Sequence, residues 1–294
     1  MMFMENNVNI FSHKVNKDAK LFDYLKNELI LSFRQTNAFI KNNQLMINKK
    51  IVTKNKSILE GDIISLHFEN ETNDYEPENI PLNILYETDD LLIIDKPPHY
   101  LVHPTKNHTN HTIANSVSYY FQKQNLKRKI RFVNRLDRDT SGILVIAKNP
   151  YSHSFLTKQF ERNQTIKKYL TIIDGHLNAK NGAIETRIHK DVNDIKYQVN
   201  DKGKLSMTLY KVLKENEKYS LVECELKSGR THQIRLSLAS IGAYILGDSL
   251  YYETSDIINR QALHAYRLNF IEPRTFKKQE IICELPQDMK KIIL

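Results

Sequence analysis

The feature that most constrains the fold is a short apolar run, Ile143–Ala147, together with the polar stretch that leads into it. The run is rich in β-branched residues and is bounded by a glycine and by an Asn-Pro pair, which favours a buried strand over a helix. Asp137 precedes the run and stands between Arg135 and Arg138. A carboxylate near guanidinium groups keeps its charge at neutral pH, which suits a catalytic group and equally a structural ion pair. On this stretch alone, the structural ion pair is the stronger interpretation.

The composition indicates a folded chain with a sizeable core. The 294 residues leave room for one large domain and a small one, and 40% are hydrophobic. We see neither a signal peptide nor an apolar run long enough to span a membrane, so we expect a cytoplasmic protein. The two cysteines, Cys224 and Cys283, lack CxxC spacing, which argues against a disulfide framework and a cysteine-based zinc site.

The charge is unevenly distributed along the chain. The net charge is +9, which suggests an anionic partner such as nucleic acid. Residues 1–80 have a net charge of −1, and residues 81–294 have a net charge of +10. The densest basic patch lies between residues 123 and 135, just before Asp137, and is interleaved with Phe132. Its central triplet is predicted to contact phosphates: Lys127, Arg128 and Lys129.

We interpret the first 68 residues as a loose leader, residues 1–12, followed by a small domain, residues 13–68. In that domain, Asp18 can cap a helix that starts near residue 19. Ser32 can cap a second helix through about residue 41, and short alternating strands follow. On the second helix we expect Phe33 and Ile40 to point inward, and Arg34 and Lys41 to point outward as candidate RNA contacts.

An acidic segment, residues 69–80, separates this small domain from the rest of the chain. It holds five acids and no base, and we predict a linker that also repels an RNA backbone. The larger domain, residues 81–294, then shows strand, helix and hairpin patterns in alternation.

Four motifs in the larger domain carry a resemblance to a known family. The first motif extends from Tyr86-Glu87, through Asp95-Lys96-Pro97, to His103-Pro104. The second is Arg-Leu-Asp-x-x-Thr-Ser-Gly at residues 135–142, and the third is Lys167-x-Tyr169. The fourth is Gly-Arg-Thr-His-Gln-Ile-Arg at residues 229–235. In this order they closely resemble the RluA family of RNA pseudouridine synthases, over roughly residues 82–273. The small domain resembles the S4 RNA-binding module that one branch of the family carries. Asn134 replaces a frequent His and His99 a frequent Gly, and we expect the first change to have a small effect.

The resemblance implies the pseudouridine synthase fold, which is α+β with a mixed, mostly antiparallel central sheet flanked by helices. The small N-terminal domain would be an α/β S4-like domain. The family isomerises uridine in RNA to pseudouridine without a cofactor, so no metal site is expected. RNA is the implied partner, with ribosomal RNA of the large subunit favoured over transfer RNA, and the protein is expected to be a monomer.

By the same resemblance, Asp137 matches the catalytic aspartate, which would attack C1′ of the ribose or take a proton from C2′. Tyr169 matches the tyrosine that packs on the target base, and Arg235 matches the arginine that pairs with the aspartate. Further residues are predicted as substrate or phosphate contacts: Arg135, Lys167, Arg230 and His232.

Two other function classes fit parts of the sequence. A hydrolase could use Ser141, His232 and an acid, but the sequence lacks a nucleophile elbow. A non-catalytic RNA-binding protein of the translation apparatus would explain the basic surface. It would not require Asp137, Tyr169 and Arg235 to occur together.

Overall fold

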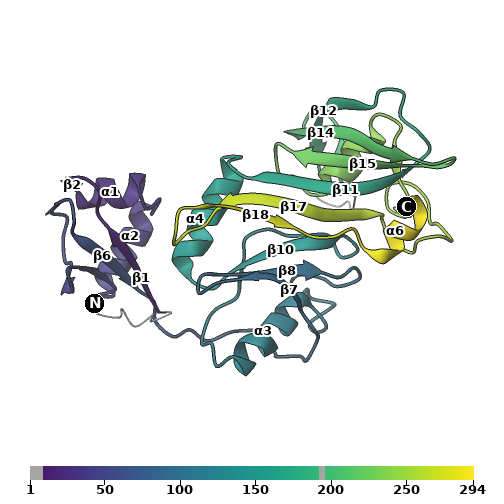
Figure 1. The fold of residues 1–294 in the computed structure, drawn as a ribbon. Helices are drawn as coiled ribbons and strands as arrows, with labels where there is room; N and C mark the ends of the chain where they lie inside the picture. Colours follow the sequence, from purple (N-terminus) through teal and green to yellow (C-terminus); the bar gives the residue numbers. More distant parts are fainter. Residues whose placement is uncertain (1–8, 192–195) are drawn as a thin grey trace.

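The computed structural model describes residues 9–191 and 196–294, which form a small N-terminal module and a larger C-terminal domain (Figure 1). In the module, two short helices cover a four-stranded sheet of order β1-β6-β3-β4, while β2 pairs with β5. Ser32 caps α2 as predicted, in a reciprocal capping box with Gln35. The elements are β1 (Ile10–Lys14), β2 (Ala19–Lys20), α1 (Leu21–Asn27), α2 (Phe33–Lys41), β3 (Leu45–Ile47), β4 (Lys50–Ile51), β5 (Ser57–Ile58) and β6 (Ile63–His67).

Three details of the module differ from the prediction. The predicted leader reached residue 12, but β1 begins at Ile10 and pairs with β6, while residues 1–8 lie outside the described residues. Asp18 does not cap α1, because its carboxylate accepts the backbone N–H of Glu60 and α1 starts only at Leu21. Phe33 does not point inward, because 68% of the residue is exposed.

The C-terminal domain is built on a mixed, mostly antiparallel sheet, as predicted, and this sheet has twelve strands in the described residues. Its main path runs β13-β12-β14-β15-β11-β17-β10-β8-β7, with β9, β16 and β18 paired at the side. All pairs are antiparallel except β10 with β17. The strands are β7 (Asn83–Glu87), β8 (Leu91–Lys96), β9 (Arg131–Phe132), β10 (Ser141–Ala147), β11 (Ile166–Asp174), β12 (Asn181–His189), β13 (Gln198–Val199), β14 (Lys204–Glu215), β15 (Tyr219–Leu226), β16 (Tyr244–Ile245), β17 (Leu263–Ile271) and β18 (Lys278–Ile282).

Four helices flank this sheet: α3 (Ile113–Lys123), α4 (Pro150–Glu161), α5 (Gln233–Ala239) and α6 (Gln287–Ile293). The predicted apolar run forms β10, which is buried along its whole length at the centre of the sheet. The predicted alternation of strands and helices is present, because α3, α4 and α5 each lie between two strands in chain order. Across residues 9–191 and 196–294, no helix is long and apolar enough to cross a membrane.

The acidic segment is not a free spacer, because it lies along the C-terminal domain. Its backbone carbonyls accept hydrogen bonds from side chains of α3, including Asn115 Nδ2 to Glu76 O at 2.9 Å. Glu71 forms an ion pair with Arg131, and Asp74 forms one with Lys129 at 3.2 Å. The predicted spacer therefore neutralises part of the basic patch that we expected to face RNA.

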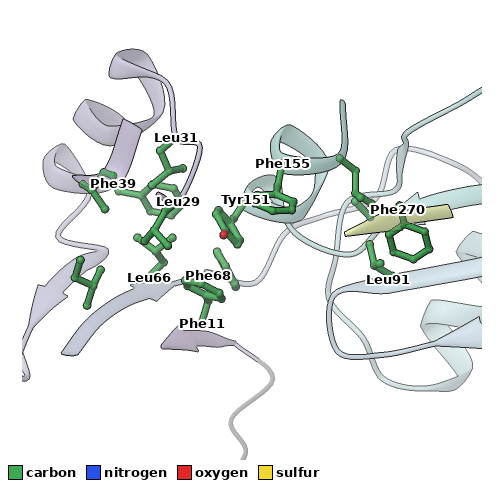
Figure 2. Close-up of a cluster of buried hydrophobic side chains, with 14 of the residues drawn as sticks. Phe11, Leu29, Leu31, Phe39, Leu66, Phe68, Leu91, Tyr151, Phe155 and Phe270 are labelled. Carbon is green, nitrogen blue, oxygen red and sulfur yellow. The ribbon is translucent and has the colours of Figure 1, made fainter. Parts of the chain in front are cut away.

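The module is docked against α4 and the hairpin of β17 and β18. Figure 2 shows one apolar cluster in which Phe11 of β1 lies beside Tyr151 of α4, with ring centroids 4.4 Å apart. Arg274 donates to the carbonyl of Ile10 at 2.8 Å and holds Asp90 of the C-terminal domain with two further hydrogen bonds. Buried apolar contact and a shared arginine thus fix the module to the larger domain.

Candidate active site

The loop that carries Asp137 connects β9 to β10 and is held by buried cations. Lys96 Nζ donates 2.8 Å to the carbonyl of Arg138 and also to the carbonyls of Pro97 and Tyr100. Burial lowers the pKa of Lys96 to about 7. Arg260 Nη1 donates to the carbonyl of Asp139 at 3.2 Å. Because the backbone on the C-terminal side of Asp137 is held in this way, its carboxylate is presented from a fixed position.

The Thr-Ser-Gly sequence after Asp137 has a steric explanation. Gly142 has a φ of +108°, and a Cβ there would lie 2.2 Å from the carbonyl oxygen of Ala265 on β17. Only glycine allows β10 to start so close to its parallel neighbour. Asn134, which replaces the family's frequent His, bridges the loop to β10 through Ile143 O and Val145 N. His99, which replaces a frequent Gly, keeps a left-handed φ of +69°.

Arg235 lies between two carboxylates. Its Nη1 is 3.1 Å from Asp137 Oδ2, so the predicted pairing is present. Its Nε and Nη2 bind the carboxylate of Asp248 at 2.7 and 2.6 Å, and its guanidinium lies 4.8 Å from the ring centroid of Tyr251. Burial alone would lower the pKa of Arg235, but Asp248 outweighs burial and raises it. Arg235 is therefore a buried, permanently charged group that is aimed at Asp137.

Asp248 was not among the predicted site residues, although it holds the predicted partner of Asp137. Only 1% of it is exposed, and it orients Arg235 in a bidentate geometry. The sequence feature that could have indicated Asp248 is the Gly247-Asp248 pair, which directly follows the buried residues Ile245 and Leu246. Gly247 itself is required there, since a Cβ would lie 2.3 Å from the carbonyl oxygen of Arg260.

His232 approaches Asp137 from the start of α5. Its backbone is in the left-handed region with a φ of +56°, which is unusual for a residue other than glycine and occurs where surrounding contacts enforce it. The Nδ1 atom lies 2.7 Å from the hydroxyl of Tyr251, and Nε2 lies 3.7 Å from Asp137 Oδ2. Burial lowers the pKa of His232 despite the nearby Asp137, so the ring is neutral at pH 7.

Tyr169 lies on β11, next to Asp137. The pairing of β11 with β17 shifts register between Lys168 and Tyr169, and such a bulge re-aims a side chain. Burial, assisted by the charge of Asp137, raises the pKa of Tyr169, so the phenol stays protonated. It offers an aromatic face beside the carboxylate.

Three of these groups, Asp137, Tyr169 and His232, line one cleft of about 760 Å³. Asp137 and Tyr169 line its wall, and Lys167 lies 5.6 Å from the ring centroid of Phe160. Burial lowers the pKa of Lys167, and nearby Lys227 adds to this effect. The predicted contacts that line the cleft are Arg135, Lys167, Arg230 and His232.

Other predicted contacts lie elsewhere. The prediction of Arg128 as a phosphate contact is wrong, because the residue is 4% exposed and donates to the carbonyl of Glu69 and to Asn9. Lys129 is exposed but pairs with Asp74, while Lys127 is exposed. Arg34 and Lys41 point outward on α2, as predicted.

The hydrolase interpretation is also wrong in its pairing of Ser141 with His232. Ser141 is 2% exposed, and its Oγ lies 2.9 Å from Nδ1 of the buried His264. His232 is instead bound to Tyr251 and faces Asp137.

Comparison with known proteins is consistent with this site. Residues 90–240 match the RNA pseudouridylate synthase family. The chain is 37% identical over 276 residues to "Uncharacterized RNA pseudouridine synthase YhcT" of Bacillus subtilis, covering 92% of this chain and 91% of that protein. It is 34% identical over 296 residues to ribosomal large subunit pseudouridine synthase D of Buchnera aphidicola, covering 94% of each.

The fold is similar to that of human RNA pseudouridylate synthase domain containing 1, with a TM-score of 0.61 at 23% identity, over 74% of this chain and 89% of that one. The sequence matches extend over nearly the whole chain and include the loop of Asp137 and the start of α5. The chain therefore belongs to the RNA pseudouridylate synthase family and is an RNA pseudouridine synthase.

Proposed function

We propose that this synthase isomerises uridines of large-subunit ribosomal RNA to pseudouridine, with Asp137 as the group that acts on the ribose. The observation that carries the proposal is the placement of Asp137: its carboxylate lines the cleft and is held by Arg235, which Asp248 fixes in turn. An aromatic face and several cations surround the same carboxylate.

The reaction needs one base to leave its stack, detach from the sugar, rotate and rejoin through C5. Flipping the target out of its stack costs a few kcal/mol, which contacts in the pocket offset. In this proposal Tyr169 packs on the uracil, and the cleft walls retain the detached base and limit access of water. Asp137 either attacks C1′ or removes the proton from C2′, and both routes place its carboxylate beside the ribose.

Two observations support an RNA target, and the first of them points to ribosomal RNA. The first is the similarity, at 30–35% identity, to proteins named ribosomal large subunit pseudouridine synthase D. The second is the exposed pair Arg135 and Arg230 at the cleft, which can bind phosphates of a folded RNA around the target nucleotide.

The decisive variant is Asp137→Asn, which removes the charge and keeps the shape. We expect it to abolish pseudouridine formation on a large-subunit rRNA transcript, while the affinity for that RNA stays within about twofold. Asp139→Asn is the matched control, because Asp139 lies on the same loop but pairs with His99 and Arg138 at its surface. Activity of the Asp137→Asn variant, or equal loss in both variants, would contradict the role of Asp137.

The target is tested by mapping pseudouridine in cellular RNA with and without the protein. We expect sites in large-subunit rRNA to disappear and to return when the wild-type chain is supplied. Loss confined to transfer RNA would reassign the substrate, and an unchanged map would contradict ribosomal RNA as the target.

A further inference from the structure

An exposed aromatic pair stands out on the N-terminal module. Phe33 is the first residue of α2 and is 68% exposed. Its ring lies 5.9 Å from that of the half-buried Phe22, in an edge-to-face arrangement at 70°. Such a pair fixes the orientation of the exposed ring. Phe33 is the only phenylalanine among the exposed large apolar residues of the described chain, and an exposed aromatic face is a surface on which a base can stack.

Cations lie on the segments next to this pair. Arg34 follows Phe33 directly, and the segment with Lys54 and Lys56 is tied to α1, since Asn55 Oδ1 accepts the backbone N–H of Phe22 at 3.1 Å. Lys20 lies next to this segment through the pairing of β2 with β5. In the described part of the module, none of these four cations forms an ion pair, whereas Lys17 pairs with Glu28. Of the acids nearby, Asp23 is exposed on α1.

The module as a whole is basic, although the first 80 residues are close to neutral. Residues 10–68 contain ten lysines and arginines and five acids, a net charge of +5. The compensating acids belong to residues 69–80, which lie along the C-terminal domain. The surface that carries Phe33 is therefore suited to a polyanion.

The pair is also fixed relative to the catalytic cleft, because α4 contacts both. On one face of α4, Ser154 Oγ lies 3.0 Å from Oε1 of Gln35, in the first turn of α2, and Lys158 donates to the carbonyl of Ile30. On another face, Thr157 and Phe160 line the cleft. In Figure 1, α4 lies at the end of the C-terminal domain that faces the module.

We propose that Phe33, supported by Phe22, is a stacking platform for an unpaired nucleotide of the substrate RNA, outside the catalytic cleft. Lys20, Lys54, Lys56 and Arg34 contact the flanking phosphates. Aromatic faces among cations bind single-stranded RNA, because every base stacks and every nucleotide carries a phosphate. A protein partner is disfavoured, because it would have to desolvate four cations around a small apolar contact. The inference rests on the proposed RNA substrate but assigns a separate site.

The test is equilibrium binding of the full chain to a labelled 12-nucleotide RNA of mixed sequence, single-stranded or as a duplex. We expect Phe33→Ala to weaken single-strand binding about tenfold, because one base loses its stacking face. Phe33→Trp should keep the affinity, and Phe33→Leu should lose it, which separates stacking from apolar contact. Duplex binding should stay unchanged. Ile51→Ala is the matched control, an exposed apolar residue on the edge strand β4 of the same module.

A second measurement separates this inference from the proposed function. With a large-subunit rRNA transcript, Phe33→Ala should raise KM and leave kcat unchanged, because the platform does not touch the reacting atoms. If the wild-type chain is active and the Phe33→Ala variant shows unchanged RNA binding and unchanged KM, the proposed function stands and the stacking platform is overturned. A shift in sedimentation on Phe33→Ala also overturns it, because the ring would then be a protein contact. An inactive wild-type chain overturns the proposed substrate, while the oligonucleotide result still decides the platform.

Discussion

Two basic regions of this synthase use arginine in opposite ways. In the basic patch before Asp137, Arg128 is buried and Arg131 pairs with Glu71 of the acidic segment. In the cleft, one buried arginine, Arg235, organises the carboxylates, while Arg135 and Arg230 remain exposed. In the first region, charge joins two segments of the chain. In the second, it orients a carboxylate and lines an open cleft.

This difference teaches that a dense run of basic residues need not be a binding surface. Burial of Glu71 would raise its pKa, but the hydrogen bonds from Arg131 outweigh burial and lower it. The acid that neutralises Arg131 lies about 60 residues away in the sequence. A count of charges in a local window therefore overestimates the cations that are available to RNA.

Among the changes that test this comparison, Asp248→Asn is expected to have the largest effect, because it breaks the buried pair with Arg235. We expect kcat to fall about 100-fold, because Arg235 loses the partner that aims it at Asp137. The free energy of unfolding should fall by about 4 kcal/mol, since a buried guanidinium loses its counterion. Single-turnover kinetics and urea unfolding, each at a temperature where the variant is folded, measure the two effects.

Glu71→Gln is the matched variant in the other region. Its partner Arg131 is only partly buried, so we expect a loss of stability of about 1 kcal/mol and an unchanged kcat. Equal losses of kcat in both variants would mean that the two arginine networks do not differ in function.

Acid titration separates the same two regions. His264, beneath the loop of Asp137, is buried against Ser141, and burial lowers its pKa from 6.5 to about 4. The unfolded chain therefore binds more protons than the folded chain between these values, and stability falls as the pH drops from 6.5 towards 4. The loss at pH 4 is about 3 kcal/mol for this residue. The ion pair of Glu71 with Arg131 weakens only below pH 4.5, because the pKa of Glu71 is lowered from its ordinary value of 4.5.

Urea unfolding at a series of pH values measures this effect. His264→Asn should flatten the stability curve between pH 6.5 and 4.5, whereas Glu71→Gln should change it only at lower pH. A curve for His264→Asn as steep as that of the wild type would mean that other buried histidines dominate the acid response.

Local patterns predicted the parts of this molecule that depend on neighbouring residues. The strand after Asp137 and the cap at Ser32 follow from short-range rules, and both are present. Family motifs predicted the pairing of Arg235 with Asp137 across 98 residues, which no local pattern contains. The role of Asp248 and the burial of Arg128 depend on which distant segments meet, so composition and spacing could not show them.

One further pair of variants, Arg128→Ala and Arg135→Ala, tests the comparison most directly. Arg128→Ala should lower the free energy of unfolding by about 2 kcal/mol, because the buried Arg128 side chain and its hydrogen bonds to Glu69 and Asn9 are lost. It should leave the salt dependence of RNA binding unchanged. Arg135→Ala should leave the free energy of unfolding unchanged. It should reduce the slope of log Kd against log salt concentration by about 1, because one exposed cation at the cleft no longer contacts a phosphate. If Arg128→Ala reduced the slope and Arg135→Ala did not, the basic patch would be the RNA contact and the cleft cations would be structural.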